Sequence, residues 1–358
     1  RDVLGSRGLG DVYKRQALST AVIMSASMLV GCGNNKSKEN TDKSFKIGMV
    51  ADIGGINDES FNQSAWEGLQ KAEKDFGIEV KVIESKQASE YLQNMESLLD
   101  EDVDMVIGVG YTMKEDIEKQ AKNYPDKQFV LIDETYDSIP ENVTPILFRE
   151  NEAAYLTGLV AGKMTENNNV GFIGGIQTPV ISRFEYGYKA GVKEANKDCN
   201  VNVQYAGTFS DAAKGKSIAN QMYGNGSDII LAAAGGTGLG SIESAKEQNK
   251  YAIGVDRDQS DLAPKNVLTS ALKKVNVGVY DTVKEFVEGK LTGGQEKVYG
   301  LKEDGVGIPE TTKNLVPQDI IDYVNSMIEK IKNDEIKVPS NEEEYKLSLI
   351  HISEPTRP

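Results

Sequence analysis

Short apolar runs alternate with stretches of helical periodicity along most of this chain, and this alternation restricts the possible folds more than any other feature. Met105–Val109 and Phe129–Asp133 are apolar runs of strand length, and the helical stretches Tyr91–Leu99 and Lys114–Asn123 precede them. Strands and helices that alternate with a period of roughly 20 to 30 residues are typical of a parallel, doubly wound sheet. The sequence therefore predicts an α/β fold.

The alternation begins again after Ile146–Phe148, which predicts a second lobe. It consists of the expected elements Asn151–Met164, Asn169–Ile173, Ser182–Ala195, Val201–Tyr205, Ala212–Tyr223, Asp228–Ala233, Gly240–Gln248 and Tyr251–Val255. The remaining stretches are Val267–Leu272, Val275–Glu288, Lys297–Tyr299 and Gln318–Asn333. They contain too few strands for a third lobe, so we expect them to complete the first two. The expected first lobe comprises residues 45–148 and 269–293, and the second comprises residues 149–268 and 294–343.

The stretch Ile47–Trp66 (IGMVADIGGINDESFNQSAW) has the pattern of a strand, a polar glycine-rich loop and a helix. The helix has Ser60 as a candidate N-cap, followed by apolar residues at helical spacing. In such units ligands bind beyond the carboxyl ends of the strands. The loop and first turn present Asp52, Asn57, Asp58, Phe61 and Asn62. They contain no lysine and no phosphate-loop spacing, which favours a neutral polar ligand with a planar part.

Three apolar runs end in an aspartate, namely Asp52, Asp133 and Asp256. Aspartate after a strand is also common in turns and as a helix N-cap, so a single one would be weak evidence for a site. In a parallel sheet, however, all three positions lie at carboxyl ends and could meet in one crevice. Carboxylates that accept hydrogen bonds from hydroxyl groups gain about 1.5–3 kcal/mol each, which is a usual way to hold a sugar.

Further candidate residues follow other strands. Phe209 lies between a strand and a helix, where it could face Phe61 as a second aromatic or belong to the core. Lys273 could pair with Asp256 and donate to a ligand hydroxyl, or it could be a solvated lysine, as we expect for Lys274. These alternatives remain open from the residue pattern alone.

The segment GGTGLG at residues 235–240 is rich in glycine but does not have the G-x-G-x-x-G spacing of dinucleotide-binding loops. Gly236 could allow a ligand to approach the backbone closely, and a tight turn between strand and helix is the alternative.

Composition excludes several classes of function. The formal net charge of −15 over 358 residues would repel nucleic acid, so no nucleic-acid partner is expected. The only histidine, His351, lies in the C-terminal stretch 346–358, which resembles translated adapter or vector sequence. Histidine-dependent catalysis and histidine-ligated zinc are therefore not expected, and we predict no catalytic residue, cofactor or metal site.

Both ends of the chain contain segments that we do not expect to belong to the folded body. Residues 1–16 and 346–358 resemble translated adapter or vector sequence and are excluded from fold reasoning. Residues 17–31 are apolar and have the length of a signal peptide, followed by an anchor and polar tether at residues 32–44. The alternatives are a degraded transmembrane helix or a signal peptide with an incidental cysteine.

The sequence Leu29-Val30-Gly31-Cys32 resembles a bacterial lipobox. It predicts cleavage before Cys32, lipid attachment to Cys32, and anchoring to the extracytoplasmic face of the cell membrane. The other cysteine, Cys199, then has no disulfide partner and is expected to be a structural residue.

Eight ordered motifs resemble the basic membrane protein family of substrate-binding lipoproteins, and most of all its PnrA-like purine nucleoside receptors. They are ADIGGINDESFNQSAWEGL, YPDKQFVLID, NEAAYLTGLVAG, VGFIGG, GTFSDAAKGK, AAAGGTGLG, IGVDRDQ and TSALKK, between about Phe45 and Asn341. The resemblance implies a type I periplasmic-binding-protein fold. In this fold two doubly wound lobes are joined by three crossovers at a hinge, and they close on a ligand in the cleft between them.

The resemblance also implies a function and roles for the residues. It implies a monomeric receptor of an ABC importer that binds guanosine, inosine or adenosine and delivers it to the permease subunits. Phe61 and Phe209 would enclose the purine, Asp133 would face the edge of the base, and Asp256 and Lys273 would face the ribose. The remaining implied ligand-binding residues are Asp52, Asn57, Asn62, Gly236 and Tyr111, and relatives often differ at the last of these.

Two alternatives belong to other classes of function. One is an enzyme that processes nucleosides or sugars, which the lack of histidine outside residues 346–358 and the incomplete glycine spacing argue against. The other is a surface receptor of the same fold that serves no transporter.

Overall fold

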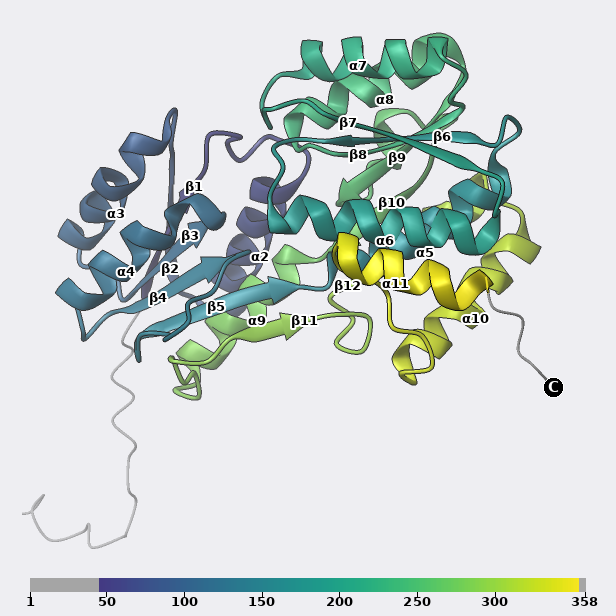
Figure 1. Cartoon of the computed structure of the whole chain (residues 1–358). Coiled ribbons are helices and arrows are strands. Elements are labelled where there is room, and N and C mark those ends of the chain that lie inside the picture. Colours follow the sequence, from purple (N-terminus) through teal and green to yellow (C-terminus); the bar gives the residue numbers. More distant parts are fainter. Residues whose placement is uncertain (1–44, 354–358) are drawn as a thin grey trace, which may run out of the picture. The chain divides into compact units, whose positions relative to one another are not determined.

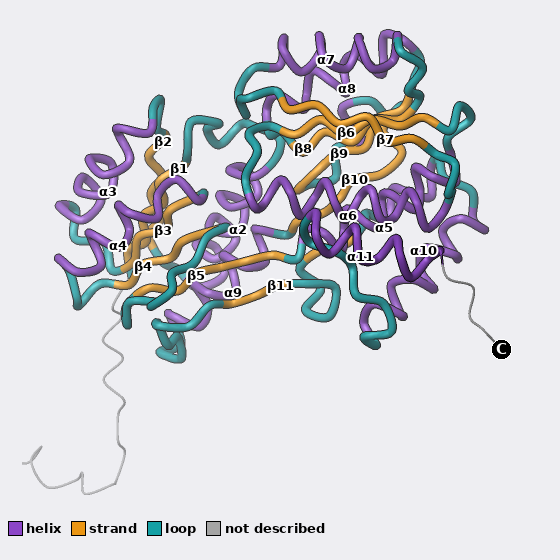
Figure 2. Tube along the Cα trace, in the orientation of Figure 1, coloured by secondary structure: helices purple, strands orange, loops and turns teal. Residues whose placement is uncertain are grey.

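A computed structural model describes residues 45–353 of the chain (Figure 1). The expected signal peptide, the lipid anchor at Cys32 and the tether lie outside the described residues. Residues 45–353 contain two lobes, each built on a six-stranded sheet covered by helices on both faces (Figure 2). Within this part of the chain, no helix is both long enough and apolar enough to cross a membrane.

The first lobe is built on a parallel sheet with the strand order β11-β5-β4-β3-β1-β2. Its strands are β1 (Lys46–Ala51), β2 (Glu79–Glu84), β3 (Met105–Val109), β4 (Gln128–Ile132), β5 (Val143–Phe148) and β11 (Lys297–Tyr299). Its helices are α2 (Phe61–Phe76), α3 (Tyr91–Asp100), α4 (Lys114–Asn123) and α9 (Val275–Val287).

Alternate residues of these strands are buried on opposite faces of the sheet. Val106 and Phe129 pack with buried residues of α3 and α4, whereas Ile107 and Val130 pack with those of α2 and α9. Because both faces are covered, the inner strands are mainly apolar, as expected for a parallel sheet. The edge strand β2 instead exposes Glu79, Lys81 and Glu84.

The second lobe has the strand order β12-β10-β9-β8-β6-β7, in which only the short β12 is antiparallel to its neighbour. Its strands are β6 (Asn169–Gly174), β7 (Asn200–Tyr205), β8 (Ile229–Ala233), β9 (Tyr251–Asp256), β10 (Val267–Lys273) and β12 (Val306–Gly307). Its helices are α5 (Glu150–Met164), α6 (Pro179–Ala195), α7 (Ala212–Gly224), α8 (Gly236–Gln248), α10 (Gln318–Lys332) and α11 (Glu342–Ser353). Helices α5 and α6 share one core with the sheet, and α7 and α8 share another.

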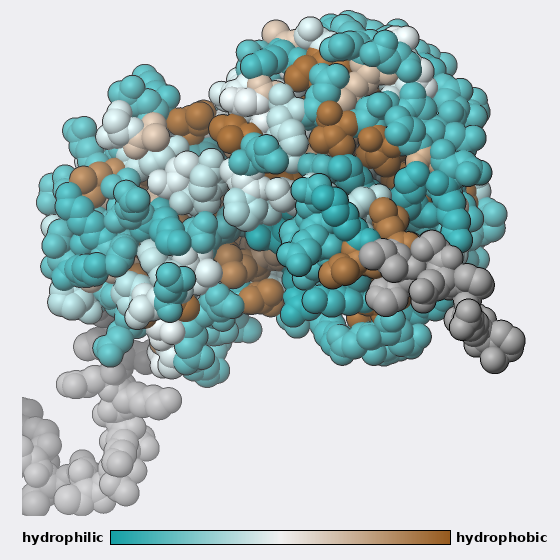
Figure 3. Space-filling model, viewed as in Figure 1, coloured by the Kyte–Doolittle hydropathy of each residue, from teal (hydrophilic) through white to brown (hydrophobic). Residues whose placement is uncertain are grey.

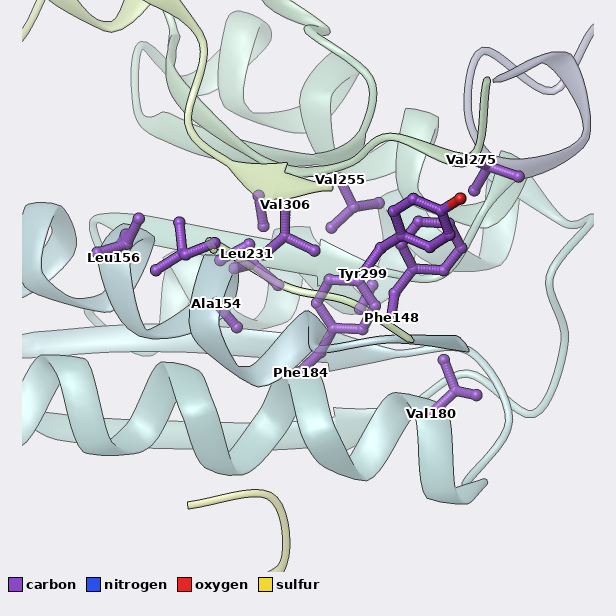
Figure 4. Packing of buried hydrophobic residues seen from close by; sticks show 14 of the residues in the cluster. Phe148, Ala154, Leu156, Val180, Phe184, Leu231, Val255, Val275, Tyr299 and Val306 are labelled. Carbon is purple, nitrogen blue, oxygen red and sulfur yellow. The ribbon is translucent and has the colours of Figure 1, made fainter. Parts of the chain in front are cut away.

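The chain passes between the lobes three times, after β5, after β10 and after β11. Buried apolar residues from both lobes form one continuous core cluster near these crossovers (Figure 4). In it, the rings of Phe148 and Tyr299 stack with their centroids 5.6 Å apart. The family's three crossovers are therefore present.

Two of the expected lobe boundaries are wrong. We expected residues 269–273 to belong to the first lobe, but strand β10 pairs with β9 in the second lobe. Strand β11 pairs with β5 in the first lobe, although we expected residues 294–343 to lie wholly in the second. Both errors have one cause, because strand pairing depends on distant partners that a local pattern does not reveal.

Smaller differences concern the ends of helices. Helix α8 begins at Gly236 rather than Gly240, and α6 begins at Pro179 rather than Ser182. Helix α11 continues beyond Tyr345 into the excluded C-terminal stretch, where the side chain of Leu347 is 54% exposed. Cys199 is buried, and within residues 45–353 it forms no disulfide.

Candidate functional site

A cavity lined by residues of both lobes lies at the carboxyl ends of their strands. It contains about 660 Å³ of space not filled by atoms, which includes solvent at its mouth. Its lining includes nine of the ten expected ligand-binding residues: Asp52, Phe61, Asn62, Tyr111, Asp133, Phe209, Gly236, Asp256 and Lys273. Residues separated by more than 200 positions therefore meet in one site.

Asn57 is the exception, because it is exposed and does not line this cavity. Its neighbour Asp58 is buried and lines the cavity instead. The Asp58 carboxylate accepts hydrogen bonds from the backbone N–H of Ser60, Asn62 and Gln63 at 2.9, 2.9 and 3.1 Å. An acidic side chain thus satisfies the free N–H groups at the start of α2.

Ser60 occupies the N-cap position of α2, as expected, but its side chain makes no capping bond. Its hydroxyl instead donates to the carboxylate of Asp256 in the other lobe.

The first loop is held by hydrogen bonds between its own polar side chains. Asn62 accepts from the backbone N–H of Asp52 at 3.0 Å, and its amide donates to Asp52 Oδ1 at 2.8 Å and to Asp58 at 3.0 Å. These bonds use all the hydrogen-bonding capacity of Asn62 except one acceptor site, so Asn62 positions Asp52. Burial raises the pKa of Asp52 to about 6.

The strand-end residues Asp133 and Asp256 both have left-handed backbone conformations, with φ of 74° and 63°. Aspartate and asparagine tolerate this region better than other residues with a side chain, and such conformations are concentrated at functional sites. Both side chains are buried where they line the cavity. Burial raises the pKa of Asp256 to about 6 and also raises that of Asp133, although Lys273 opposes the shift at both.

Lys273 pairs neither with Asp256, its candidate partner from the sequence, nor with solvent alone. Its ammonium group forms an ion pair with Asp133 and lies 3.3 Å from Glu150, which is fully buried at the start of α5. Arg183 of α6 donates to the same Glu150 at 2.6 Å. A buried lysine requires such partners, and the nearby carboxylates raise its pKa against the effect of burial.

Glu150 shows the complementary effect. Burial alone would raise its pKa, but the positive charges of Arg183 and Lys273 outweigh burial and lower it. The network joins the end of β4 in one lobe to the end of β10 and to α6 in the other. Its residues lie beside the crossovers after β5 and β10.

The two expected aromatic residues contribute to the cavity from different lobes. The Lys273 ammonium lies 4.7 Å from the centroid of the Phe61 ring, a cation–π contact that orients this ring. The Phe209 ring packs on the backbone of Gly175, where an added Cβ would lie 2.2 Å from Phe209 Cε1. The Phe61 ring is therefore held by a residue of the opposite lobe, and the Phe209 ring is held by the backbone of its own lobe.

Asp133 keeps one acceptor for a ligand. Its Oδ2 is paired with Lys273, whereas its Oδ1 is buried and has no hydrogen-bond partner among the residues that the structure describes. A buried acceptor left without a donor is costly, so a ligand N–H or O–H at this position would be favourable.

Sequence reasoning missed several residues of the site. The start of α6 adds an apolar wall made of Val180, Ile181 and Phe184. The pair Thr178-Pro179 was a usable signal, because Thr178 caps α6 and proline is favoured at the first helical position. Glu150 and Arg183 had no local signal, because their interaction depends on the packing of α5 against α6.

Comparison with known proteins identifies the family. The family model described as ABC transporter substrate-binding protein PnrA-like matches residues 45–342. The chain belongs to this family. It is therefore a substrate-binding protein of ABC transporters and not an enzyme, and the enzyme alternative is wrong.

Individual relatives cover nearly the whole PnrA-like chain. It is 39% identical over 350 residues to the CD4+ T-cell-stimulating antigen of Listeria monocytogenes, covering 90% of this chain and 98% of the relative. It is 38% identical, with the same coverage, to the ABC transporter nucleoside-binding protein BmpA of Lactococcus lactis subsp. cremoris.

A solved structure supports the fold of this PnrA-like protein. An ABC transporter solute-binding protein from Aeropyrum pernix K1 has a TM-score of 0.78 and 28% identity, covering 86% of this chain and 96% of that chain. The expected type I periplasmic-binding-protein fold is thereby confirmed.

Proposed function

We propose that this protein is the extracytoplasmic receptor of an ABC importer and that it binds purine nucleosides, such as guanosine, inosine and adenosine, and delivers them to the permease. The observation that carries the proposal is the combination of flat apolar walls with buried acceptors in one cavity. Phe61 and Phe209 contribute aromatic rings from opposite lobes, and Asp133 and Asp256 contribute carboxylates from strand ends. A purine matches the rings, and a ribose matches the carboxylates.

Each group has a distinct role in this proposal. The base lies between Phe61 and Phe209, where stacking contributes about 1–3 kcal/mol per base. Oδ1 of Asp133 accepts a hydrogen bond from the edge of the base. Asp256 accepts from the ribose hydroxyls, and Lys273 holds Asp133 and the Phe61 ring in place.

The charge of the site favours a nucleoside over a nucleotide. Asp52, Asp133 and Asp256 line the cavity, and the only positive group among its lining residues, Lys273, is already paired. A phosphate placed there would be repelled by the carboxylates without a free cation to bind it.

The proposal includes a lipid anchor at Cys32 and a monomeric receptor. The motif at residues 29–32 followed by the polar residues 33–44 supports the anchor. A polar tether of this length would span roughly 20 Å and would hold the binding lobes near the membrane and its permease.

Calorimetry with guanosine, ribose and guanosine monophosphate tests the function. We expect guanosine to bind, and we expect ribose to bind at least about 5-fold more weakly because it lacks the stacking base. Guanosine monophosphate should bind more weakly than guanosine because of repulsion. If no purine nucleoside binds, or if ribose binds as tightly as guanosine, the proposal is wrong.

A further inference from the structure

Arg257 makes contacts across the cleft that are separate from the cavity. It is the first residue after β9 in the second lobe, and its guanidinium group donates to two carboxylates of the first lobe. Nη1 lies 2.6 Å from Oε2 of Glu59, and Nη2 lies 2.7 Å from Oε1 of Glu67 on α2. None of these three residues is among those that line the cavity, and their side chains are 24%, 43% and 41% exposed.

The turn that presents Arg257 also presents Asp256 to the cavity. Asp256 is left-handed, and the backbone N–H of Arg257 donates to the carbonyl of Val255 at 2.7 Å, which closes a very tight turn. Asp256 therefore lines the cavity while the next side chain reaches across the cleft. The position of Arg257 is coupled to that of Asp256 because the two residues share this turn.

The partner segment in the first lobe is fixed in a similar way. Glu59 has a φ of 51°, and its backbone N–H donates to Gln63 at 3.1 Å. Its carbonyl accepts from Nε2 of Gln259 at 2.8 Å, a second bond across the cleft. Gln259 is itself buried and accepts from the backbone of Val255 at 3.0 Å. Both sides of the contact are therefore built on local conformations that hold the charged groups in place.

These contacts differ from the other interlobe charges in their relation to the hinge. Lys273, Asp133, Glu150 and Arg183 lie beside the crossovers after β5 and β10. Arg257 directly follows β9, and Glu67 belongs to α2; neither β9 nor α2 is adjacent in sequence to a crossover. Because Arg257 and its two carboxylate partners belong to different lobes, we expect opening of the cleft to separate them.

We propose that Arg257, Glu59 and Glu67 form an interlobe latch, in which Arg257 is a positioning residue that stabilises the closed state and slows release of the ligand. A ligand or contact changes such an equilibrium only through interactions that differ between the two states, and these ion pairs exist only when the lobes meet. Arginine suits this role because its planar fork can donate to two carboxylates at once, which lysine cannot do with the same geometry.

The first test is the variant Arg257→Met measured with guanosine, so it rests on the proposed function for its ligand. We expect Kd to rise about 10-fold, within the range usual for coupling between two states. The change should lie in the dissociation rate, with the association rate changed much less. Lys71→Met is the matched control, because Lys71 lies on the same helix as Glu67 but pairs with Asp75 within the first lobe. A Kd for Arg257→Met within about twofold of the wild type would overturn the latch.

A double-mutant cycle with Glu67→Gln separates the latch from general damage to the fold. If the two residues act together, the double variant should bind about as well as Arg257→Met alone. Additive losses would show that the two residues act independently and would overturn the proposal. Raising the salt from about 0.01 to 1 M should increase the wild-type Kd more than that of Arg257→Met, because these partly exposed charges are screened.

Failure of the proposed function has a different signature. If guanosine does not bind the wild type, the nucleoside proposal fails, and small-angle scattering of the ligand-free protein then tests the latch. A larger radius of gyration for Arg257→Met than for the wild type and Lys71→Met would support it, and equal radii would overturn it.

Discussion

The two aspartates at the ends of β4 and β9 combine three unusual properties. Asp133 and Asp256 are buried, left-handed in backbone conformation and raised in pKa by burial. A buried carboxylate that lacks enough partners lowers the stability of the free protein, and a ligand that donates hydrogen bonds to it recovers part of that free energy. These two residues therefore lower the stability of the ligand-free protein, and a bound ligand would restore part of it.

Binding of guanosine should weaken as the pH falls below about 6. Asp52 and Asp256 have pKa values raised by burial to about 6, so at pH 5 roughly nine-tenths of each group would be protonated in the free protein. A protonated carboxyl is a poorer acceptor for a ribose hydroxyl, and Kd at pH 5 should exceed that at pH 7.5 by about 10-fold for each carboxylate involved. Calorimetry of wild type and Asp256→Asn checks this, and equal pH slopes in both would contradict it.

The stability of the free protein should change in the opposite direction. Because the folded pKa of Asp256 lies above the unfolded value of 3.8, the folded state takes up the proton first between pH about 6 and 3.8. This group's contribution to the free energy of unfolding therefore rises as the pH falls through that window. At pH 8 the free energy of unfolding of Asp256→Asn should exceed that of the wild type by up to about 3 kcal/mol. This difference should disappear near pH 4. An advantage that does not change with pH would argue against a raised pKa.

The aromatic and acidic residues should affect different parts of the ligand. Phe61→Ala and Phe209→Ala should each weaken guanosine by about 1–3 kcal/mol, or about 5- to 150-fold in Kd, and should weaken guanine similarly. Asp256→Asn should harm guanosine far more than guanine, because guanine has no ribose. Calorimetry with both ligands decides the matter, and an unchanged guanosine-to-guanine ratio in all three variants would refute the division of the site.

The packing of α5 on α6 positions the charged residues Glu150 and Arg183 at the scale of the elements. The two helices approach closely because glycines face the opposing backbone. A Cβ added to Gly191 would lie 2.0 Å from the carbonyl oxygen of Tyr155. No real Cβ tolerates this distance, so glycine at this position is required by packing rather than by backbone flexibility.

Gly191→Ala should destabilise the protein, although alanine normally stabilises a helix relative to glycine by about 1 kcal/mol. Overpacking of the helix interface should outweigh propensity and cost about 1–3 kcal/mol. Thermal unfolding should show a fall of several degrees in Tm. Gly224→Ala at the end of α7 is the control, because nothing lies within 4 Å of its added Cβ, and its Tm should not fall. Equal effects at both positions would contradict the packing argument.

The whole molecule combines an acidic surface with a membrane anchor in the proposed function. Hydrophilic residues cover most of the face shown in Figure 3, in keeping with the net charge of −15. Apolar residues on this face form small separate groups rather than a broad band. Residues 45–353 also contain no helix that could span a membrane. In the proposed function, attachment to the membrane therefore depends on the lipid at Cys32.

Cys32→Ser, expressed with a start codon and signal peptide, should move the protein from the membrane fraction to the supernatant. The physical reason is that stable anchoring requires two or more acyl chains, which the serine variant cannot receive in the same way. Detergent phase partitioning with immunoblotting measures the distribution. Identical partitioning of the two forms would rule out the lipid anchor.

Local patterns in the sequence determined the order of strands and helices, the restart of the fold at a second lobe, and the strand-end aspartates. They did so because periodicity, capping signals and apolar runs act over a few residues. The same kind of signal predicted Phe61 as a ligand-binding residue. Phe209 was predicted with the help of the family resemblance.

Only the tertiary structure decided which distant groups meet. It assigned β10 and β11 to their sheets, paired Lys273 with Asp133 rather than Asp256, and placed Asp58 rather than Asn57 in the cavity. It also joined Glu150 to Arg183, and Arg257 to its two glutamates. The physical reason is that a buried charge selects its partner by distance and desolvation, and both depend on how the lobes pack.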